Sequence, residues 1–128
     1  MSVDRDLIRE ELNTEALNAF LIERIQDIKA KDIVKLDLRK LEEAPTDFFI
    51  ICEGESLIQV KAIADHIISE VKKHTGQIPN HVEGKTNSTW ILVDYFTTVV
   101  HIFFKDTRKF YQLESLWSDA DTVEYENL

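Results

Sequence analysis

Two places in this 128-residue sequence carry side chains that could do chemistry. The first is the segment Glu-Gly-Glu-Ser at residues 53–56, which lies between an apolar run and an amphipathic pattern with helical spacing. A helix N-terminus at such a junction can bind phosphate through its free backbone N–H groups. The second is Asp94, an acid inside the most apolar stretch of the chain, residues 90–104. A carboxylate at a strand end is a candidate catalytic acid or magnesium ligand.

The 53–56 segment fits a helix cap better than a phosphate site. It has one glycine, and its two glutamates would repel a phosphate, so it is neither a P-loop nor a dinucleotide-binding glycine motif. Ser56 and Gln59 instead have the S-x-x-Q spacing of a capping box, in which each side chain bonds a backbone N–H group of the first turn. The sequence therefore favours a structural role for this turn.

Asp94 has no partner in sequence for metal-dependent chemistry. Nucleotidyl transfer needs two carboxylates that converge on Mg²⁺, and no second acid lies two residues from Asp94. Asp37 and Asp47 could approach in space, but nothing in the sequence requires it. His101 falls on a predicted strand, where a hydrogen-bonded structural histidine is commoner than a base. The alternative of a small nucleotidyltransferase-like enzyme, which would use the 53–56 turn and Asp94, is kept as the second hypothesis.

Cysteine and histidine usage predicts neither a metal site nor a bound cofactor. The single cysteine, Cys52, excludes an internal disulfide, and its apolar neighbours predict a small buried side chain. The four histidines show no ligand-type spacing.

Composition predicts a soluble globular protein with an acidic surface. Hydrophobic residues make up 44% of the chain and charged residues 30%, and 24 acids against 15 bases give a net charge of −9. Such a surface repels phosphate backbones, so little or no direct nucleic-acid binding is expected, and it would be steered towards a basic partner. No apolar run is long enough to span a bilayer, and the polar N-terminus resembles no signal peptide. A cytoplasmic protein without a membrane partner is expected.

Periodicity predicts one α/β domain over residues 1–128, with a mixed sheet flanked by helices. Its core would run from about residue 14 to 120, between a charged segment, 1–12, and an acidic tail, 118–128, without core signal. The predicted elements are a helix 14–30, strands 32–38 and 48–52, a helix 56–75 closed by Gly76, a short extended piece 80–84, strands 89–95 and 97–104, and a helix 106–117 capped by Asp106 or Thr107. Phe110, Leu113 and Trp117 lie at helical spacing in the last of these.

Both faces of the predicted hairpin at 89–104 are apolar or aromatic. Trp90, Leu92 and Asp94 share one face, and Ile91, Val93 and Tyr95 share the other. One face must pack on helices, and the other must be covered by further helix or by a partner. The alternation alone leaves open which face is core.

Five segments in fixed order resemble the ribosomal silencing factor family, also called Iojap-like. They are TDFFIICEGESLIQVKAIADHI, HVEG, WILVDY, VVHIFF and RKFYQLESLW, which lie within residues 46–117. The match as a whole runs from about residue 20 to residue 120. The resemblance implies a nucleotidyltransferase-like fold without catalytic carboxylates, and a protein that is not an enzyme. It also implies binding to the large ribosomal subunit, at its protein of the L-fourteen family, which blocks subunit joining and represses translation.

The resemblance further implies which residues contact the ribosomal protein. They are Trp90, Leu92, Asp94, Tyr95, Phe96, Val100, Arg108 and Tyr111. Glu83, beside Gly84, also matches a family position. The chain departs from the family where Phe96-Thr97-Thr98 replaces a glycine-containing turn, so the turn type is not predicted. A third hypothesis is a homodimer that hides the apolar sheet face in its own interface.

Overall fold

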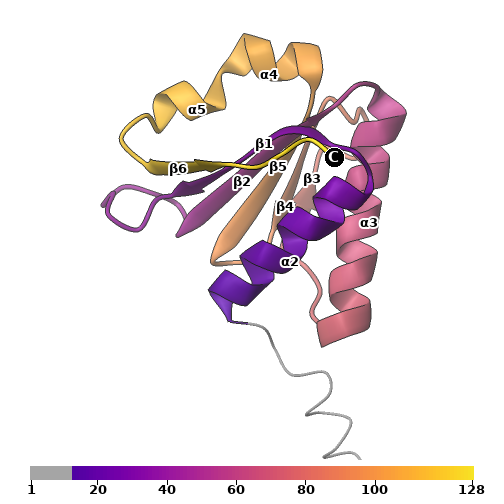
Figure 1. Cartoon of the computed structure of the whole chain (residues 1–128), viewed down its shortest axis with the longest axis horizontal. Coiled ribbons are helices and arrows are strands. Elements are labelled where there is room, and N and C mark those ends of the chain that lie inside the picture. The colour runs from indigo at the N-terminus through magenta and orange to yellow at the C-terminus, as the bar shows by residue number, and fades with distance from the viewer. Residues whose placement is uncertain (1–12) are drawn as a thin grey trace, which may run out of the picture.

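A mixed β-sheet with helices on both faces forms the centre of the protein (Figure 1). The computed structural model describes residues 13–128, so the predicted charged segment 1–12 lies outside the described residues. In chain order the elements are α2 (Thr14–Asp27), β1 (Lys31–Asp37), β2 (Phe48–Gly54), α3 (Leu57–Thr75), β3 (His81–Glu83), β4 (Trp90–Asp94), β5 (Thr98–Phe104), α4 (Lys105–Tyr111), α5 (Leu113–Leu116) and β6 (Asp121–Glu124). This confirms the predicted α/β class with a mixed sheet.

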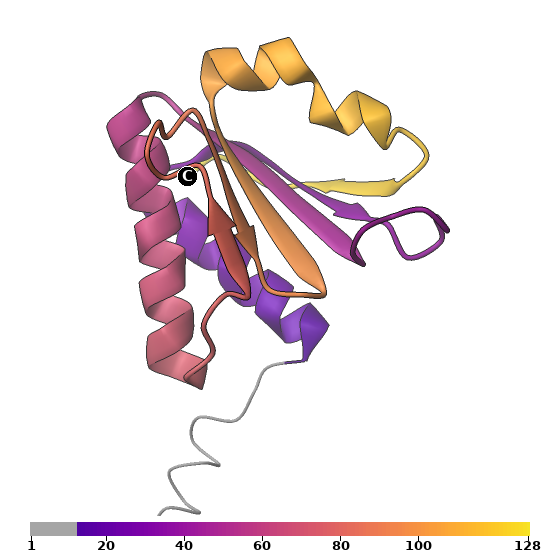
Figure 2. The ribbon, with the colours of Figure 1, turned by 180° about the vertical axis from the view of Figure 1, so that it is seen from behind.

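The six strands stand in the order β3-β4-β5-β2-β1-β6. The central pair, β2 and β5, is parallel, and every other neighbouring pair is antiparallel. Helices α2 and α3 cover one face of the sheet, and α4 and α5 stand over the other (Figures 1 and 2). We call these the α3 face and the α4 face.

Strand β2 is buried on both faces, which suits its unbroken apolar run. Ile50 and Cys52 point into the larger core, between the sheet and helices α2 and α3. Phe49 and Ile51 point the other way, into a smaller core beneath α4 and α5. The larger core also takes its members from α2, α3, β4 and β5: Leu21, Ile25, Val60, Ile63, Ile67, Ile91, Val93, Val100 and Ile102.

The caps of the two long helices follow the sequence signals. Ser56 Oγ accepts from the Gln59 backbone N–H, as the predicted capping box requires. Gln59 Oε1 accepts from the N–H of Glu55, one residue before the cap, instead of from that of Ser56. Gly76 closes α3 with φ of +76°. Asn13 caps α2, and its side-chain oxygen accepts from the Ala16 N–H. That helix ends at Asp27 rather than near residue 30, because Lys29 adopts a φ of +60°.

The predicted helix at 106–117 is interrupted. Gln112 adopts φ of +48°, which ends α4 and separates it from the single turn of α5. Helix α4 begins at Lys105, directly after β5, and no side chain caps it, so the prediction of Asp106 or Thr107 as cap is wrong. The chain turns straight from strand into helix, which brings α4 back over β5.

The predicted acidic tail contains a sixth strand. Residues Asp121–Glu124 pair antiparallel with β1, although all four side chains are exposed. The Tyr125 N–H donates to the Ile33 carbonyl oxygen at 2.9 Å, and its ring packs against the larger core. Backbone pairing, rather than apolar burial, therefore holds this strand.

Candidate partner-binding surface

The hairpin β4–β5 has one buried face and one partly exposed face. Ile91, Val93 and Tyr95 point to the α3 face and are buried. Trp90 and Leu92 point to the α4 face, where they pack at the margin of the smaller core and stay partly exposed. The α3 face is therefore core, and the α4 face of β4 is available to a partner.

Two of the predicted contact residues lie on the wrong side for contact. Tyr95 and Val100 are buried in the larger core, beneath α2 and α3. Burial also raises the pKa of the Tyr95 hydroxyl above its ordinary range. The structure contradicts a direct contact role for both side chains and assigns them to packing.

An aromatic group crosses from β4 to α4. The Trp90 ring stacks on buried Phe103 at 4.7 Å between centroids, and the Tyr111 centroid lies 5.0 Å from that of Trp90. Phe110 meets Tyr111 edge-to-face at 5.1 Å. Phe110 and Tyr111 are 80% and 52% exposed. We call Trp90, Phe110 and Tyr111 the aromatic patch, a surface of the kind favoured at protein interfaces.

Phe110, which lies at helical spacing with Leu113 and Trp117, is exposed rather than part of the core. Two adjacent aromatics on a helix point about 100° apart, so both cannot face the same core. Leu113 fills the space under the α4–α5 pair, which leaves Phe110 outside. The adjacency of Phe110 and Tyr111 was the one sequence signal of this exposed pair.

Arg108 holds α4 against the sheet, and its side chain is only 9% exposed. Its Nη1 donates to the Asp32 carbonyl oxygen at 2.7 Å and to Glu53 Oε1 at 3.2 Å, and Nε reaches Glu114 at 3.4 Å. Burial raises the pKa of Glu53, while the Arg108 charge opposes that rise. The largely buried guanidinium thus joins β1, β2 and α5, and its contact role stays a prediction.

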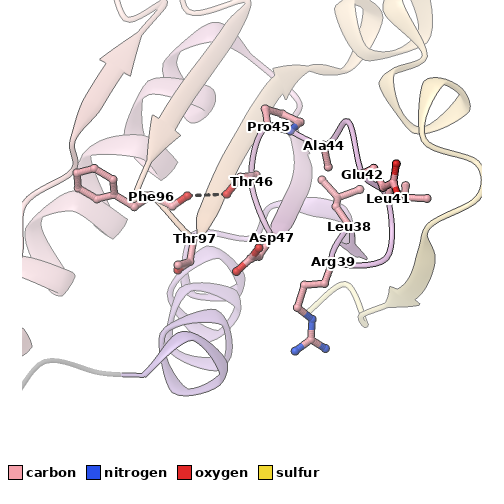
Figure 3. Close-up of a pocket in the computed structure, with 10 residues that line it drawn as sticks. All are labelled: Leu38, Arg39, Leu41, Glu42, Ala44, Pro45, Thr46, Asp47, Phe96 and Thr97. Atoms are coloured by element: carbon pink, nitrogen blue, oxygen red, sulfur yellow. Dashed lines mark hydrogen bonds between the residues drawn. The ribbon is translucent and has the colours of Figure 1, made fainter.

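The turn after β4 is built without glycine. Asp94 Oδ1 accepts from the Phe96 N–H at 2.7 Å, so the acid serves its own turn. Phe96 adopts φ of +72°, and its ring is 67% exposed. The Thr46 hydroxyl donates to the Phe96 carbonyl oxygen at 2.6 Å, and the ring points away from the 38–47 loop (Figure 3). Phe96 is thus presented at the far end of β4 from Trp90.

A shallow hollow lies beside this turn, between the 38–47 loop and the 96–97 turn (Figure 3). Arg39 is its cationic side chain, and Asp37 Oδ2 binds that guanidinium at 2.7 Å. The Arg39 side chain holds the pKa of Asp37 down to about 2. The cation is therefore already neutralised within the chain.

Gly84 allows β3 to end close against β4. Its φ is +90°, and a Cβ atom there would stand 2.0 Å from the Trp90 carbonyl oxygen. Glu83, next to it, lies opposite Leu92 in the β3–β4 pair and is exposed, with His81 Nε2 at 3.2 Å from its carboxylate. An acidic group thus borders the partly exposed Leu92.

Two side chains with reactive chemistry, Cys52 and His101, are buried. Burial raises the pKa of Cys52 to about 12, which makes its thiol inert, and lowers the pKa of His101 to about 4. No group of three or more acids, histidines or cysteines in this range could hold a metal ion. The described helices include none that is long and apolar enough to cross a membrane.

The fold and this surface define an α/β protein that presents an exposed aromatic face beside its central sheet. Comparison with known proteins shows the family to which this chain belongs. The family model described as "Ribosomal silencing factor during starvation" matches residues 11–128. The chain belongs to this ribosomal silencing factor family.

Relatives cover nearly the whole chain. The ribosomal silencing factor of Haemophilus influenzae is 45% identical over 103 residues, which are 80% of this chain and 99% of that protein. The one from Halalkalibacterium halodurans is 38% identical over 117 residues, 91% of this chain and 98% of that protein. A crystal structure of a protein from Chromobacterium violaceum superimposes with a TM-score of 0.77 at 34% identity, covering 84% of this chain and 88% of that one.

Proposed function

We propose that this protein is a translational repressor that binds the large ribosomal subunit through its protein of the L-fourteen family. The bound factor would stand where the small subunit docks and so block subunit joining. The names of the bacterial relatives support a ribosomal role, as does that of a mouse relative, "Mitochondrial assembly of ribosomal large subunit protein 1", of which the chain spans 43%. The protein would act in the cytoplasm.

The observation that carries the proposal is the exposed aromatic patch on an acidic chain. Trp90 and Tyr111 offer rigid apolar area at little cost in conformational entropy. Leu92, Asp94 and Phe96 extend the same side of β4 to its far end. The net charge of −9 would steer the factor to a basic ribosomal protein and away from ribosomal RNA.

Charge and aromatic contact predict separate kinetic effects. Electrostatic steering acts on the association rate and weakens as salt screens it. Buried aromatic anchors act on the dissociation rate. We therefore expect added salt to slow association, and loss of a patch residue to speed dissociation.

The direct test is co-sedimentation with purified large subunits, together with a subunit-joining measurement on sucrose gradients. Trp90→Ala should weaken binding by about 2 kcal/mol, roughly thirtyfold, and Tyr111→Ala by somewhat less. Ile58→Ala, at an 84% exposed residue on α3, is the matched control and should bind normally. Folded Trp90→Ala and Tyr111→Ala variants that still sediment with the subunit would refute the proposed surface.

A non-enzymatic mode of action is part of the proposal. The capping interactions use the N–H groups of Glu55 and Gln59, and Lys105 bonds Glu55 at 3.3 Å. Calorimetry with nucleoside triphosphates and Mg²⁺ should show no heat of binding. A saturable heat would favour the nucleotide-binding hypothesis instead.

The aromatic patch would also fit a second copy of this chain. A homodimer formed through it would compete with the ribosomal subunit for the same residues. Sedimentation equilibrium at several concentrations tests this, and Tyr111→Ala should shift any dimer towards monomer. A dimer that persists unchanged in that variant would use another surface.

A further inference from the structure

Trp90, the central residue of the aromatic patch, is hydrogen-bonded to a buried histidine. Its Nε1–H donates to His101 Nδ1 at 3.0 Å. The two residues are diagonal neighbours on the α4 face, because Trp90 lies opposite Phe103 and Leu92 lies opposite His101. His101 is 4% exposed and packs edge-to-face on Phe49 at 4.5 Å. The indole is therefore held by a bond as well as by its stacking on Phe103.

This bond determines which nitrogen of His101 carries the proton. An accepting Nδ1 needs a free lone pair, so the proton of the neutral ring is on Nε2. Burial lowers the pKa of His101 to about 4, which keeps the ring neutral at neutral pH. Nε2 is itself buried and has no hydrogen-bond partner in the described part of the chain.

A buried histidine with one nitrogen that lacks a hydrogen bond is energetically unfavourable in an aromatic core. A buried polar atom without a partner destabilises the fold, and a phenylalanine of similar size would avoid that cost. The one side-chain hydrogen bond found for His101 is the bond to Trp90. That bond is the feature a purely apolar side chain could not supply.

We propose that His101 is a positioning residue that sets the orientation of the Trp90 indole before a partner arrives. This inference rests on the proposed function, in which Trp90 is an anchor on the ribosomal protein. An indole held in one rotamer loses less conformational freedom when it binds, and pre-organisation of this kind slows dissociation. Tyr111 and Phe103 then flank a side chain that is already in place.

The free protein gives the first test. A Trp117→Phe background leaves Trp90 as the single tryptophan. Nitrogen-15 NMR at pH 7 should show a protonated His101 Nε2, an unprotonated Nδ1 and a scalar coupling from Nδ1 to the indole nitrogen. His101→Phe should speed exchange of the indole proton with solvent and increase indole mobility. His101→Gln, whose Oε1 can accept, should restore part of the protection.

Binding to purified large subunits gives the second test, as a double-mutant cycle. His101→Phe should dissociate roughly three- to tenfold faster, the size expected for loss of one neutral hydrogen bond. Added to Trp90→Ala, the same change should have almost no further effect, because His101 acts through the indole. A merely structural role would instead weaken both backgrounds equally.

The outcomes separate this inference from the proposed function. If Trp90→Ala weakens or abolishes binding while folded His101→Phe and His101→Gln bind like the parent, the positioning role is wrong and the surface stands. Additive effects of His101→Phe and Trp90→Ala would also refute positioning. If Trp90→Ala binds normally, the proposed surface fails and the positioning role in binding fails with it.

Discussion

The Arg108 guanidinium lies 3.2 Å from the Glu53 carboxylate in a site where both side chains are largely buried. The same nitrogen donates to the Asp32 carbonyl oxygen, so the cation links the last helical region to two strands. Helix α4 has no side-chain cap and only seven residues. Its position over β5, and with it the position of Tyr111, therefore depends on this buried cation.

Loss of the Arg108 cation should destabilise the protein strongly. Arg108→Ala leaves Glu53 buried without its counter-charge, and we expect a loss of about 3 kcal/mol in the free energy of unfolding. Lys109→Ala, at the exposed neighbouring residue, should change it by less than about 0.5 kcal/mol. Urea denaturation measures both. Equal, small effects would mean that the cluster contributes no net stability.

Acid should destabilise the protein through His101. The pKa of His101 is about 4 in the folded protein, below its ordinary value of 6.5. The unfolded chain then binds more protons between these pH values, so stability falls as pH drops from about 6.5 to about 4. The loss from His101 should reach about 3 kcal/mol. His101→Phe should remove this part of the pH dependence, and an unchanged profile in that variant would contradict the prediction.

Glycine at position 96 should relieve the backbone strain of this turn. A left-handed φ of +72° costs an L-residue about 1 kcal/mol, whereas glycine adopts it without a Cβ clash. Phe96→Gly should therefore be more stable than Phe96→Ala by up to about 1 kcal/mol, because both lack the exposed ring and differ only in backbone preference. Thermal unfolding of the pair measures this. An alanine variant at least as stable as the glycine one would show that the turn is unstrained.

Pairing of the segment after α5 with β1 should depend on the Tyr125 backbone. Tyr125→Pro removes the N–H that donates to the Ile33 carbonyl oxygen, whereas Tyr125→Ala keeps it, and both lose the ring. We expect the proline variant to be about 1 kcal/mol less stable than the alanine variant. Hydrogen exchange should show faster exchange of β1 amides that face β6 in the proline variant alone.

The sequence predicted the elements whose signals are local or periodic. Ser56, Gln59 and Gly76 determine the ends of α3 through hydrogen bonds and φ values that those residue types favour. The apolar run of β2 indicated burial on both faces, and the structure confirms it. These features depend on short-range physics, which a single sequence displays.

Features that depend on contacts between residues distant in sequence could not be predicted from local patterns. Alternation in β4 separated Trp90 from Tyr95 but could not say which side the long helices would cover. In the sequence Arg108 resembles a surface cation, because its partner Glu53 is distant along the chain. Only the fold places the two side chains side by side. Strand β6 shows no apolar pattern because it buries no side chain, so hydropathy had nothing to detect.

The place of β6 at the end of the strand order has a consequence for how the chain folds. Val34 pairs with Glu124, so most of the described chain must be made before that edge of β1 can be covered. Pairings this distant in sequence form slowly, and until then β1 exposes unpaired N–H and C=O groups beside the apolar strand β2. Three acids, Asp121, Glu124 and Glu126, are exposed on the segment that closes it. In the folded protein, repulsion between these acids on neighbouring copies discourages edge-to-edge pairing of the sheets. Strand β6 gives this protection against aggregation only after it has been synthesised and has paired with β1.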